Sequence, residues 1–190
     1  HPVYPLGLDV LRAALARRGM ESLAWDCAWP EKTLPETIDG FRPHLIGVSI
    51  RNVDNNDGVR PRYYLPDIFG LIADIKRLAD VPIVLGGSGY SLFPHEILER
   101  SEADFGLVGP GENSLPELAE RVAANLSPEH VPGLVGRNGA RNPPAPPDPP
   151  FYPVPRNIAL ARSYFEHGGS INVQLKRGCP HNCVYCTYPG

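Results

Sequence analysis

The chain has 190 residues and a formal net charge of −3 at pH 7, a length that suits one full domain and part of a second. The negative balance argues against general binding to nucleic acid or anionic membranes, and no segment approaches the ~18 unbroken apolar residues of a membrane span. We therefore expect neither nucleic acid nor membrane among the partners. No signal peptide is visible. The cysteines clustered at 179–186, without partners elsewhere, imply a reducing compartment, and we expect the cytoplasm.

Residues from Leu6 to about Leu126 alternate helix-like and strand-like patterns. The helix signals, which are apolar stripes, capping residues and prolines at a first turn, fall at 6–18, 34–36, 65–78, 94–99 and 114–126. The strand signals are short apolar runs at 21–26, 45–50, 81–85 and 103–108. This alternation predicts an α/β fold with a Rossmann-like, doubly wound parallel sheet.

The two ends of the chain and its proline-rich segment predict the domain boundaries. In such a sheet a strand should feed the first helix, but few residues precede Leu6 and the chain opens without methionine, so we expect both ends to be cut and the first strand to be missing. The prolines at 143–155 leave no room for a helix or a strand ladder and predict a stiff linker. The expected parts are a first domain at 1–135, a linker at 136–160 and the start of a second domain at 161–190.

Three small or polar loops follow the predicted strands, and a ligand of an open parallel sheet lies over these strand ends. Their glycine amides can approach a ligand closely or cradle a phosphate. The candidate binding residues are Ser49, Arg51, Asn52, Gly86, Gly87, Ser88, Gly89, Gly109, Gly111 and Glu112. Glycine also ends strands for conformational reasons, so that explanation of 86–89 stays open beside ligand binding. The charged loop at 51–62 is equally compatible with ligand contact and with a solvated connection.

Cys179, Cys183 and Cys186 form a CxxxCxxC motif near the end of the chain. Three thiolates at this spacing can bind one corner of a 4Fe–4S cluster and leave one iron open. Zinc normally takes a fourth protein ligand, whereas the remaining cysteine, Cys27, lies far upstream. His181 lies between two cysteines of the same tight loop, where its ring would struggle to reach their metal. We therefore favour an iron–sulfur cluster over a zinc or redox loop, and a reducing compartment.

The cysteine motif, with Tyr185 before its last cysteine and an apolar segment ending in Lys-Arg-Gly before it, resembles the cluster loop of radical S-adenosylmethionine (SAM) enzymes. The resemblance implies that the three cysteines hold a 4Fe–4S cluster whose open iron chelates SAM. It also implies that Tyr185 lies against the adenine and that one electron cleaves SAM to a 5′-deoxyadenosyl radical. An electron donor such as flavodoxin or ferredoxin is then an expected partner.

The order of the upstream segments resembles the cobalamin-binding domain of cobalamin-dependent radical SAM enzymes. These segments are Tyr-Pro-Leu-Gly-Leu, an Ile-Gly-Val-Ser strand, Leu-Gly-Gly-Ser-Gly and Val-Gly-Pro-Gly-Glu. The resemblance makes 1–135 a cobalamin-binding domain and 161–190 the first strand and cluster loop of a truncated (β/α) barrel. By position it places three groups around cobalamin: Gly86, Gly87, Ser88 and Gly89 at the nucleotide tail, Gly109, Gly111 and Glu112 beside the corrin or tail, and Ser49, Arg51 and Asn52 at the lower face.

The lower side of cobalt is where this chain departs from many cobalamin domains outside that family. Those domains use a DxHxxG motif whose histidine binds cobalt. Here His44 begins an HxxG sequence, but Arg42 stands where the aspartate should be, and the motif precedes a middle strand. We therefore expect no protein imidazole below cobalt, and Arg51 or a water in its place.

The resemblance implies methylation of an unactivated carbon, in which the radical abstracts hydrogen and methylcobalamin delivers the methyl group. Rearrangement, cyclisation and methylthiolation are alternatives within the enzyme class. A methylthiotransferase would carry three further cysteines for an N-terminal cluster, and only Cys27 is present there. A nucleotide- or flavin-binding module with a structural metal loop is the alternative from another class. The pocket residues belong to the barrel, so no substrate and no catalytic side chain is predicted.

Overall fold

The computed structural model describes residues 3–146, 154–175, 181 and 183–184. Two compact units divide the chain. One runs from Gly7 to Pro155, and the other combines His1–Leu6 with Arg156–Gly190. Each unit is described by itself below.

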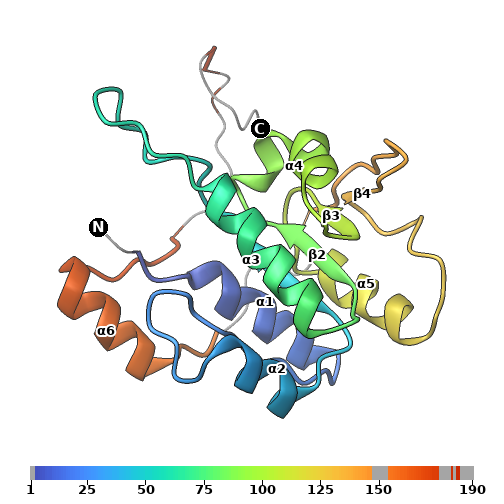
Figure 1. Ribbon diagram of the computed structural model, residues 1–190, viewed down its shortest axis with the longest axis horizontal. Helices are drawn as coiled ribbons and strands as arrows, with labels where there is room; N and C mark the ends of the chain where they lie inside the picture. The colour runs from blue at the N-terminus through green and yellow to red at the C-terminus, as the bar shows by residue number, and fades with distance from the viewer. Residues whose placement is uncertain (1–2, 147–153, 176–180, 182, 185–190) are drawn as a thin grey trace. The chain divides into compact units, whose positions relative to one another are not determined.

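The larger unit is built on a four-stranded sheet with the order β1-β2-β3-β4 (Figure 1). Strands β1 (Ile46–Ser49), β2 (Ile83–Gly86) and β3 (Phe105–Leu107) are parallel, while β4 (Leu134–Val135) pairs antiparallel with β3. The predicted strands at 45–50, 81–85 and 103–108 and the Rossmann-like fold class are confirmed. The parallel strands place their carboxyl ends, and the loops that follow them, at one edge of the sheet.

The predicted strand at 21–26 is wrong, because these residues have no regular structure. In the doubly wound order 2-1-3-4-5, the second strand of the chain pairs only with the first. The described residues hold no strand ahead of the first helix, so this segment has no ladder partner there.

The predicted helices are present as α1 (Leu6–Arg17), α2 (Leu34–Phe41), α3 (Leu65–Leu78), α4 (Pro94–Arg100) and α5 (Ser114–Ala123). A short 3-10 helix, η1 (Tyr90–Leu92), precedes α4. Helix α2 begins at a capping box in which the Glu36 carboxylate accepts the Thr33 N–H at 2.9 Å and the Thr33 hydroxyl accepts the Glu36 N–H at 3.4 Å. The smaller unit contains a further helix, α6 (Ile158–Gly168), which was not predicted.

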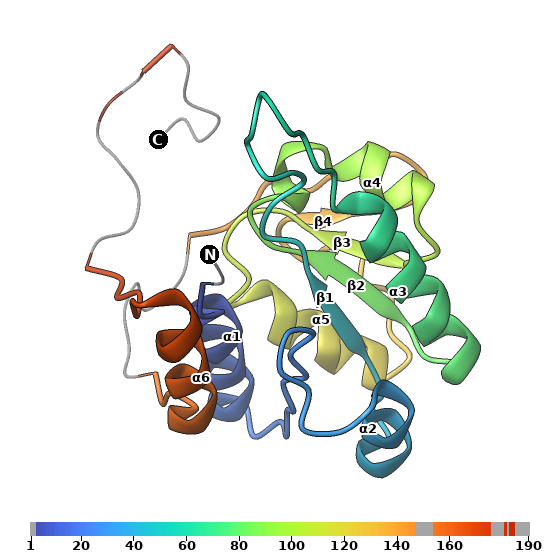
Figure 2. The ribbon, with the colours of Figure 1, turned by 60° about the vertical axis from the view of Figure 1, so that its left-hand side comes forward.

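The two faces of the sheet carry separate apolar cores. On one face the core includes Ile72 and Ile75 of α3, Ile97 and Leu98 of α4, and Leu85 of β2. On the other face Val84, Leu107 and Leu134 pack against Leu118 of α5. Helix α1 lies beside α5, and the Arg18 guanidinium forms an ion pair with Glu120 at 3.0 Å (Figure 2).

Tyr90 is fully buried in the core on the α3 and α4 side. A Cβ atom at position 106 of β3 would overlap its ring, so only glycine fits there. The Tyr90 hydroxyl has no hydrogen-bond partner within the described part of the chain. Burial raises the pKa of Tyr90 well above its usual value, so the phenol stays neutral.

We expect Tyr90→Phe to raise the free energy of unfolding by about 1 kcal/mol, because it removes a buried hydroxyl whose desolvation no hydrogen bond offsets. Chemical denaturation of both proteins measures the difference. Tyr63→Phe is the matched control, since Tyr63 is 66% exposed and should show no change. A clear loss of stability in Tyr90→Phe would mean that the hydroxyl is hydrogen-bonded in the folded protein.

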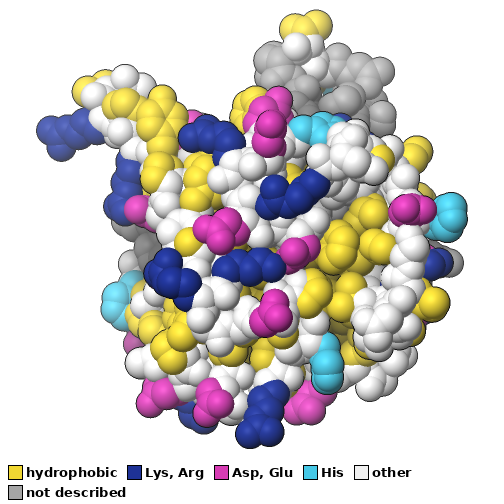
Figure 3. All heavy atoms as spheres, turned by 45° about the vertical axis from the view of Figure 1, so that its right-hand side comes forward, with side chains coloured by type: hydrophobic (Ala, Val, Ile, Leu, Met, Phe, Trp, Pro, Cys, Tyr) yellow, Lys and Arg dark blue, Asp and Glu magenta, His cyan; other side chains and the backbone are white. Residues whose placement is uncertain are grey.

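No helix in the described ranges combines the length and the apolar character that a bilayer span requires. On the face drawn in Figure 3, basic and acidic side chains are interspersed, so that face carries no large patch of a single sign.

Candidate cofactor-binding site

The three predicted binding loops are joined by hydrogen bonds at the carboxyl edge of the sheet. Ile50 at the end of β1 donates its N–H to the Gly86 carbonyl and accepts the Gly89 N–H, both at 2.8 Å. The Ser91 hydroxyl accepts the Gly109 N–H at 3.3 Å. The structure therefore brings the loops after β1, β2 and β3 into one continuous surface.

The Gly-Gly-Ser-Gly loop after β2 packs closely on the loop after β1. A Cβ at Gly87 would lie 2.6 Å from the Ile50 carbonyl oxygen, and Gly87 has a left-handed φ of +98°. A Cβ at Gly89 would lie 3.0 Å from the Arg51 carbonyl. The Ser88 hydroxyl donates to the same Arg51 oxygen at 2.9 Å. Backbone atoms thus occupy the space where a side chain at Gly87 or Gly89 would lie. The conformation and packing of the loop therefore explain why both residues are glycine.

The loop after β3 lies between α1 and the start of the proline-rich segment. A Cβ at Gly109 would lie 2.8 Å from Pro144, and one at Gly111 would lie 2.9 Å from Leu11 of α1. Glu112 is 7% exposed. Gly109, which also has a left-handed φ of +81°, has room only for glycine, whereas the contact at Gly111 is with the end of a flexible leucine side chain.

The proline-rich segment was expected to be free of ladder pairing, and the structure corrects this for its first residues. Val135 and Arg141 form an antiparallel bridge, and Asn142 donates its N–H to the Leu134 carbonyl at 2.9 Å. The Pro143 carbonyl accepts the Gly133 N–H at 3.0 Å. Proline lacks a donor but keeps its acceptor, so pairing continues through the carbonyl.

One part of the sheet lacks side-chain cover, and sequence reasoning missed it. Along β1 the large residues face the α3 core, whereas Gly47 and Ser49 alternate onto the α5 face and are exposed. A Cβ at Gly47 would touch only Val84, at 3.9 Å, and Val84 belongs to the α5-side core. We name Gly47, Ser49 and Gly86 the small-residue face. The alternation of small and large residues in Ile46–Ile50 was the signal in the sequence.

The charged loop after β1 is an ordered arm that projects from the unit (Figures 1 and 2). Asp54 and Tyr63 form an antiparallel bridge at its base. The Asn55 side chain donates to the Arg60 carbonyl at 2.9 Å and accepts the Arg62 N–H at 3.0 Å. These hydrogen bonds give the loop a defined structure. The sequence had left ligand contact and a solvated connection open for this loop, and it predicted no such internal structure. Arg51 and Asn52, at its start, are both exposed.

Two side chains have shifted pKa values: Asp57 in the arm, and Cys27, the cysteine outside the predicted cluster motif. Backbone N–H groups of Arg60 and Val59 donate to Asp57 and lower the pKa of its carboxyl, so the arm keeps this negative charge at neutral pH. Desolvation by the surrounding protein atoms and the Asp26 carboxylate raise the pKa of the Cys27 thiol. A protonated thiol is a poor metal ligand, which agrees with leaving Cys27 out of the cluster.

The predicted cluster ligands lie mostly outside the described residues. Cys183 is described and exposed, while Cys179, Cys186 and Tyr185 fall in the part that the structure does not describe. Within the described residues, no group of three or more His, Cys, Asp or Glu side chains could hold a metal ion. The cluster site therefore stays a prediction from the cysteine spacing.

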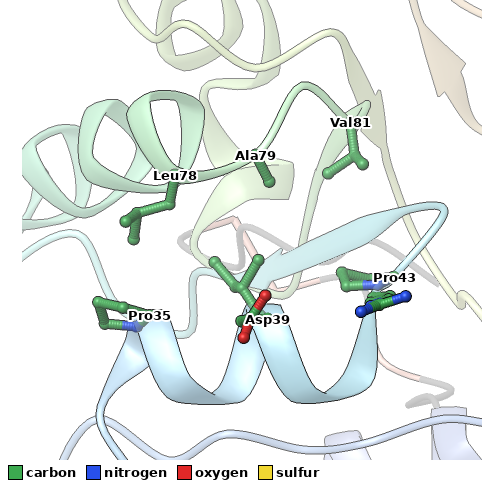
Figure 4. Close-up of a pocket in the computed structure, with 8 residues that line it drawn as sticks. Pro35, Asp39, Pro43, Leu78, Ala79 and Val81 are labelled. Carbon is green, nitrogen blue, oxygen red and sulfur yellow. The ribbon is translucent and has the colours of Figure 1, made fainter.

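A pocket of about 390 Å³ lies at the opposite edge of the sheet, between α2 and the segment that joins α3 to β2 (Figure 4). Pro43 precedes β1 and Val81 precedes β2, so the pocket is at the amino ends of the strands. It shares none of the predicted binding residues. Its lining residues are Pro35, Ile38, Asp39, Arg42, Pro43, Leu78, Ala79 and Val81.

A mainly parallel sheet with helices on both faces and joined loops at its carboxyl edge defines a Rossmann-like ligand-binding domain. The B12 binding domain family matches residues 1–119, and the chain belongs to this family.

Its relatives include cobalamin-dependent radical SAM enzymes. A tryptophan 2-C-methyltransferase from Streptomyces laurentii is 32% identical over 147 residues, which cover 74% of this chain and 24% of the relative. Hopanoid C-3 methylase from Methylococcus capsulatus is 26% identical over 193 aligned positions, covering 96% of this chain and 35% of the relative. The radical SAM methyltransferase TsrM from Kitasatospora setae, solved with cobalamin and a [4Fe–4S] cluster bound, superposes with a TM-score of 0.68 at 33% identity.

The TsrM match covers 76% of this chain and 27% of TsrM. The chain therefore spans between a quarter and about a third of the length of these relatives. These similarities confirm the predicted resemblance to cobalamin-dependent radical SAM enzymes.

Proposed function

We propose that this chain supplies the cobalamin-binding domain and the cluster-loop segment of a cobalamin-dependent radical SAM enzyme that methylates carbon. The observation that carries the proposal is a B12 binding domain followed in the same chain by a CxxxCxxC motif. The two curated relatives named above are both described as methylating carbon, which favours methylation over rearrangement and methylthiolation. A further relative, 30% identical over 123 residues, is named an anaerobic magnesium-protoporphyrin IX monomethyl ester cyclase, so cyclisation is the second candidate reaction.

The geometry of the sheet fits a large cofactor with an extended tail. On the small-residue face Gly47 and Ser49 are exposed and Gly86 is half-buried, and the glycines lack the side-chain atoms that would fill the strip. We place the nucleotide tail along Gly47, Ser49 and Gly86, which moves Ser49 from the lower face of the corrin, where the resemblance put it, to the tail. Gly87 and Gly89 act indirectly, since their close packing fixes the loop at the end of this strip. Gly109, Gly111 and Glu112 would flank the corrin or the tail.

The lower side of cobalt would face Arg51 and Asn52, which are exposed at the carboxyl edge. The Ser88 hydroxyl donates to the Arg51 carbonyl and so helps to fix the backbone from which the Arg51 side chain extends. His44 precedes β1 and is thus at the amino edge of the sheet, away from these loops. This placement supports a cobalt without a protein imidazole.

When bound, cobalamin supplies a methyl carrier, and the 4Fe–4S cluster with SAM supplies one-electron radical chemistry. The chain's own share is to hold these groups. Cys179, Cys183 and Cys186 would bind three irons and leave the fourth for SAM, with Tyr185 against the adenine. A flavodoxin or ferredoxin would deliver the electron, and a cytoplasmic setting would keep the thiols reduced.

The reaction class is tested with the intact protein, cobalamin, cluster, reductant and SAM carrying a deuterated methyl group. Tryptophan is the first substrate to assay, because one relative is named for it. Mass spectrometry and proton nuclear magnetic resonance should find the label on a carbon atom of the product. Label found only on nitrogen, oxygen or sulfur would contradict carbon methylation.

A further inference from the structure

The short helix η1 is anchored by contacts at, or just beyond, each of the three parallel strands. The Tyr90 ring is fully buried and fills the space that Gly106 of β3 leaves free. The Tyr90 N–H donates to the Ile50 carbonyl, just after β1, at 3.3 Å. The Ser91 N–H donates to the Gly87 carbonyl, just after β2, at 3.1 Å. The backbone of Ser91 is therefore held at a defined place on the carboxyl edge of the sheet.

The Ser91 hydroxyl joins the bends that follow β2 and β3. It donates to the Gly87 carbonyl at 3.1 Å and accepts the Gly109 N–H at 3.3 Å. Both glycines are at bends and have a left-handed φ, +98° at Gly87 and +81° at Gly109. Both are exposed, whereas Ser91 is half-buried. One hydroxyl on an anchored helix thus sets the spacing between two exposed glycine bends.

The first of these bends continues the small-residue face. Gly87 directly follows Gly86, the last residue of that face, and the Ser91 hydroxyl links this bend to the one at Gly109. A ligand can approach the backbone closely at such glycines, because no side chain intervenes. A ligand that reaches both bends binds more tightly when their spacing is set beforehand, since binding then does not have to order them.

We propose that Ser91 is a positioning residue for the nucleotide tail of cobalamin, whose hydroxyl holds the bends at Gly87 and Gly109 at the spacing that the tail requires. This inference rests on the proposed function. We assign the tail, and not the corrin, because the bend at Gly87 continues the face on which the tail is placed. Loss of the hydroxyl should therefore weaken the binding of a corrinoid that carries the nucleotide and spare one that lacks it.

Ser101 offers a matched control, because its hydroxyl makes the same pair of hydrogen bonds at the opposite edge of the sheet. It donates to the Leu98 carbonyl at 3.0 Å and accepts the Ala103 N–H at 3.4 Å. Ser101 precedes β3 and is 7% exposed, so Ser101→Ala should lower stability at least as much as loss of the half-buried Ser91 hydroxyl does. It should leave the affinity for cobalamin unchanged, because the predicted binding residues lie at the carboxyl edge.

The test titrates the intact protein with hydroxocobalamin and with cobinamide, the corrinoid without the nucleotide, and follows visible absorbance. In Ser91→Ala the Kd for hydroxocobalamin should rise roughly fivefold, the size expected for one lost hydrogen bond. The Kd for cobinamide should stay unchanged. Ser91→Thr keeps the hydroxyl and should restore the affinity for hydroxocobalamin. Chemical denaturation of each variant measures stability separately.

Three results would count against this role of Ser91. Equal binding of hydroxocobalamin by Ser91→Ala and Ser101→Ala would overturn the proposal, because the two hydroxyls would then contribute alike through stability. An equal loss of affinity for both corrinoids in Ser91→Ala would overturn it as well, since the nucleotide tail would not be the group that the bends hold. An unaltered protein that binds no hydroxocobalamin would contradict the proposed function, and this inference with it.

Discussion

Alanine at Cys179, Cys183 or Cys186 should abolish the 4Fe–4S cluster of the intact protein, while Cys27→Ala should leave it in place. Each of the three thiolates would hold one iron at a corner of the cluster, and two cysteines cannot hold the same geometry. Cys27 lies far upstream, and its raised pKa disfavours the thiolate that iron requires. Iron and sulfide analysis with the visible absorbance spectrum measures the loss.

His181→Ala is the second control for this experiment, since His181 lies within the motif but is not expected to bind iron. It should keep the full iron content. A full cluster in any of the three cysteine variants would contradict the ligand assignment. Loss of the cluster in Cys27→Ala would point to a fourth protein ligand and to a different kind of site.

Gly47→Val should lower the affinity for hydroxocobalamin by about 30-fold or more, equivalent to ~2 kcal/mol of steric conflict, while the fold stays intact. The valine side chain would occupy the small-residue face where we place the nucleotide tail. Its Cβ has room, because a Cβ at this position contacts only Val84 at 3.9 Å, and valine favours strands. Titration followed by visible absorbance measures the affinity, and chemical denaturation measures stability.

Two glycine variants serve as controls for Gly47→Val. Gly70→Ala in α3 has open space around its Cβ and should raise stability by up to about 1 kcal/mol without affecting cobalamin. Gly87→Val meets the Ile50 carbonyl and a left-handed φ, so it should lose stability and cobalamin together. Unchanged cobalamin binding by Gly47→Val would show that the tail does not lie along this face.

The three parallel strands could be predicted because buried parallel strands are continuous apolar runs, as in Ile83–Leu85. Strand β4 could not, since two residues carry no pattern and its pairing with β3 is set by a distant part of the chain. The segment at 21–26 has a strand-like composition but lacks a pairing partner in the described residues. Composition predicts a strand only where a neighbour completes the ladder.

The position of the site followed from topology, because loops after parallel strands meet at one edge. The contacts of each loop residue could not be predicted from the topology. The backbone contacts of Gly87 and Gly89 join segments far apart in the sequence, and no local pattern reports them. Gly47 was missed because a glycine within an apolar strand is ordinarily taken as a weak point of the strand. Its exposure becomes visible only once the helices are placed.

The central claim is that one protein holds cobalamin and a radical SAM cluster, and electron paramagnetic resonance of the intact protein purified without oxygen tests it most directly. We predict a cob(II)alamin signal without nitrogen splitting from a lower imidazole, unchanged in His44→Ala. Reduction should add the signal of a 4Fe–4S cluster that changes when SAM is supplied. A protein that shows neither cobalt nor cluster signals after reconstitution with both cofactors would contradict the claim.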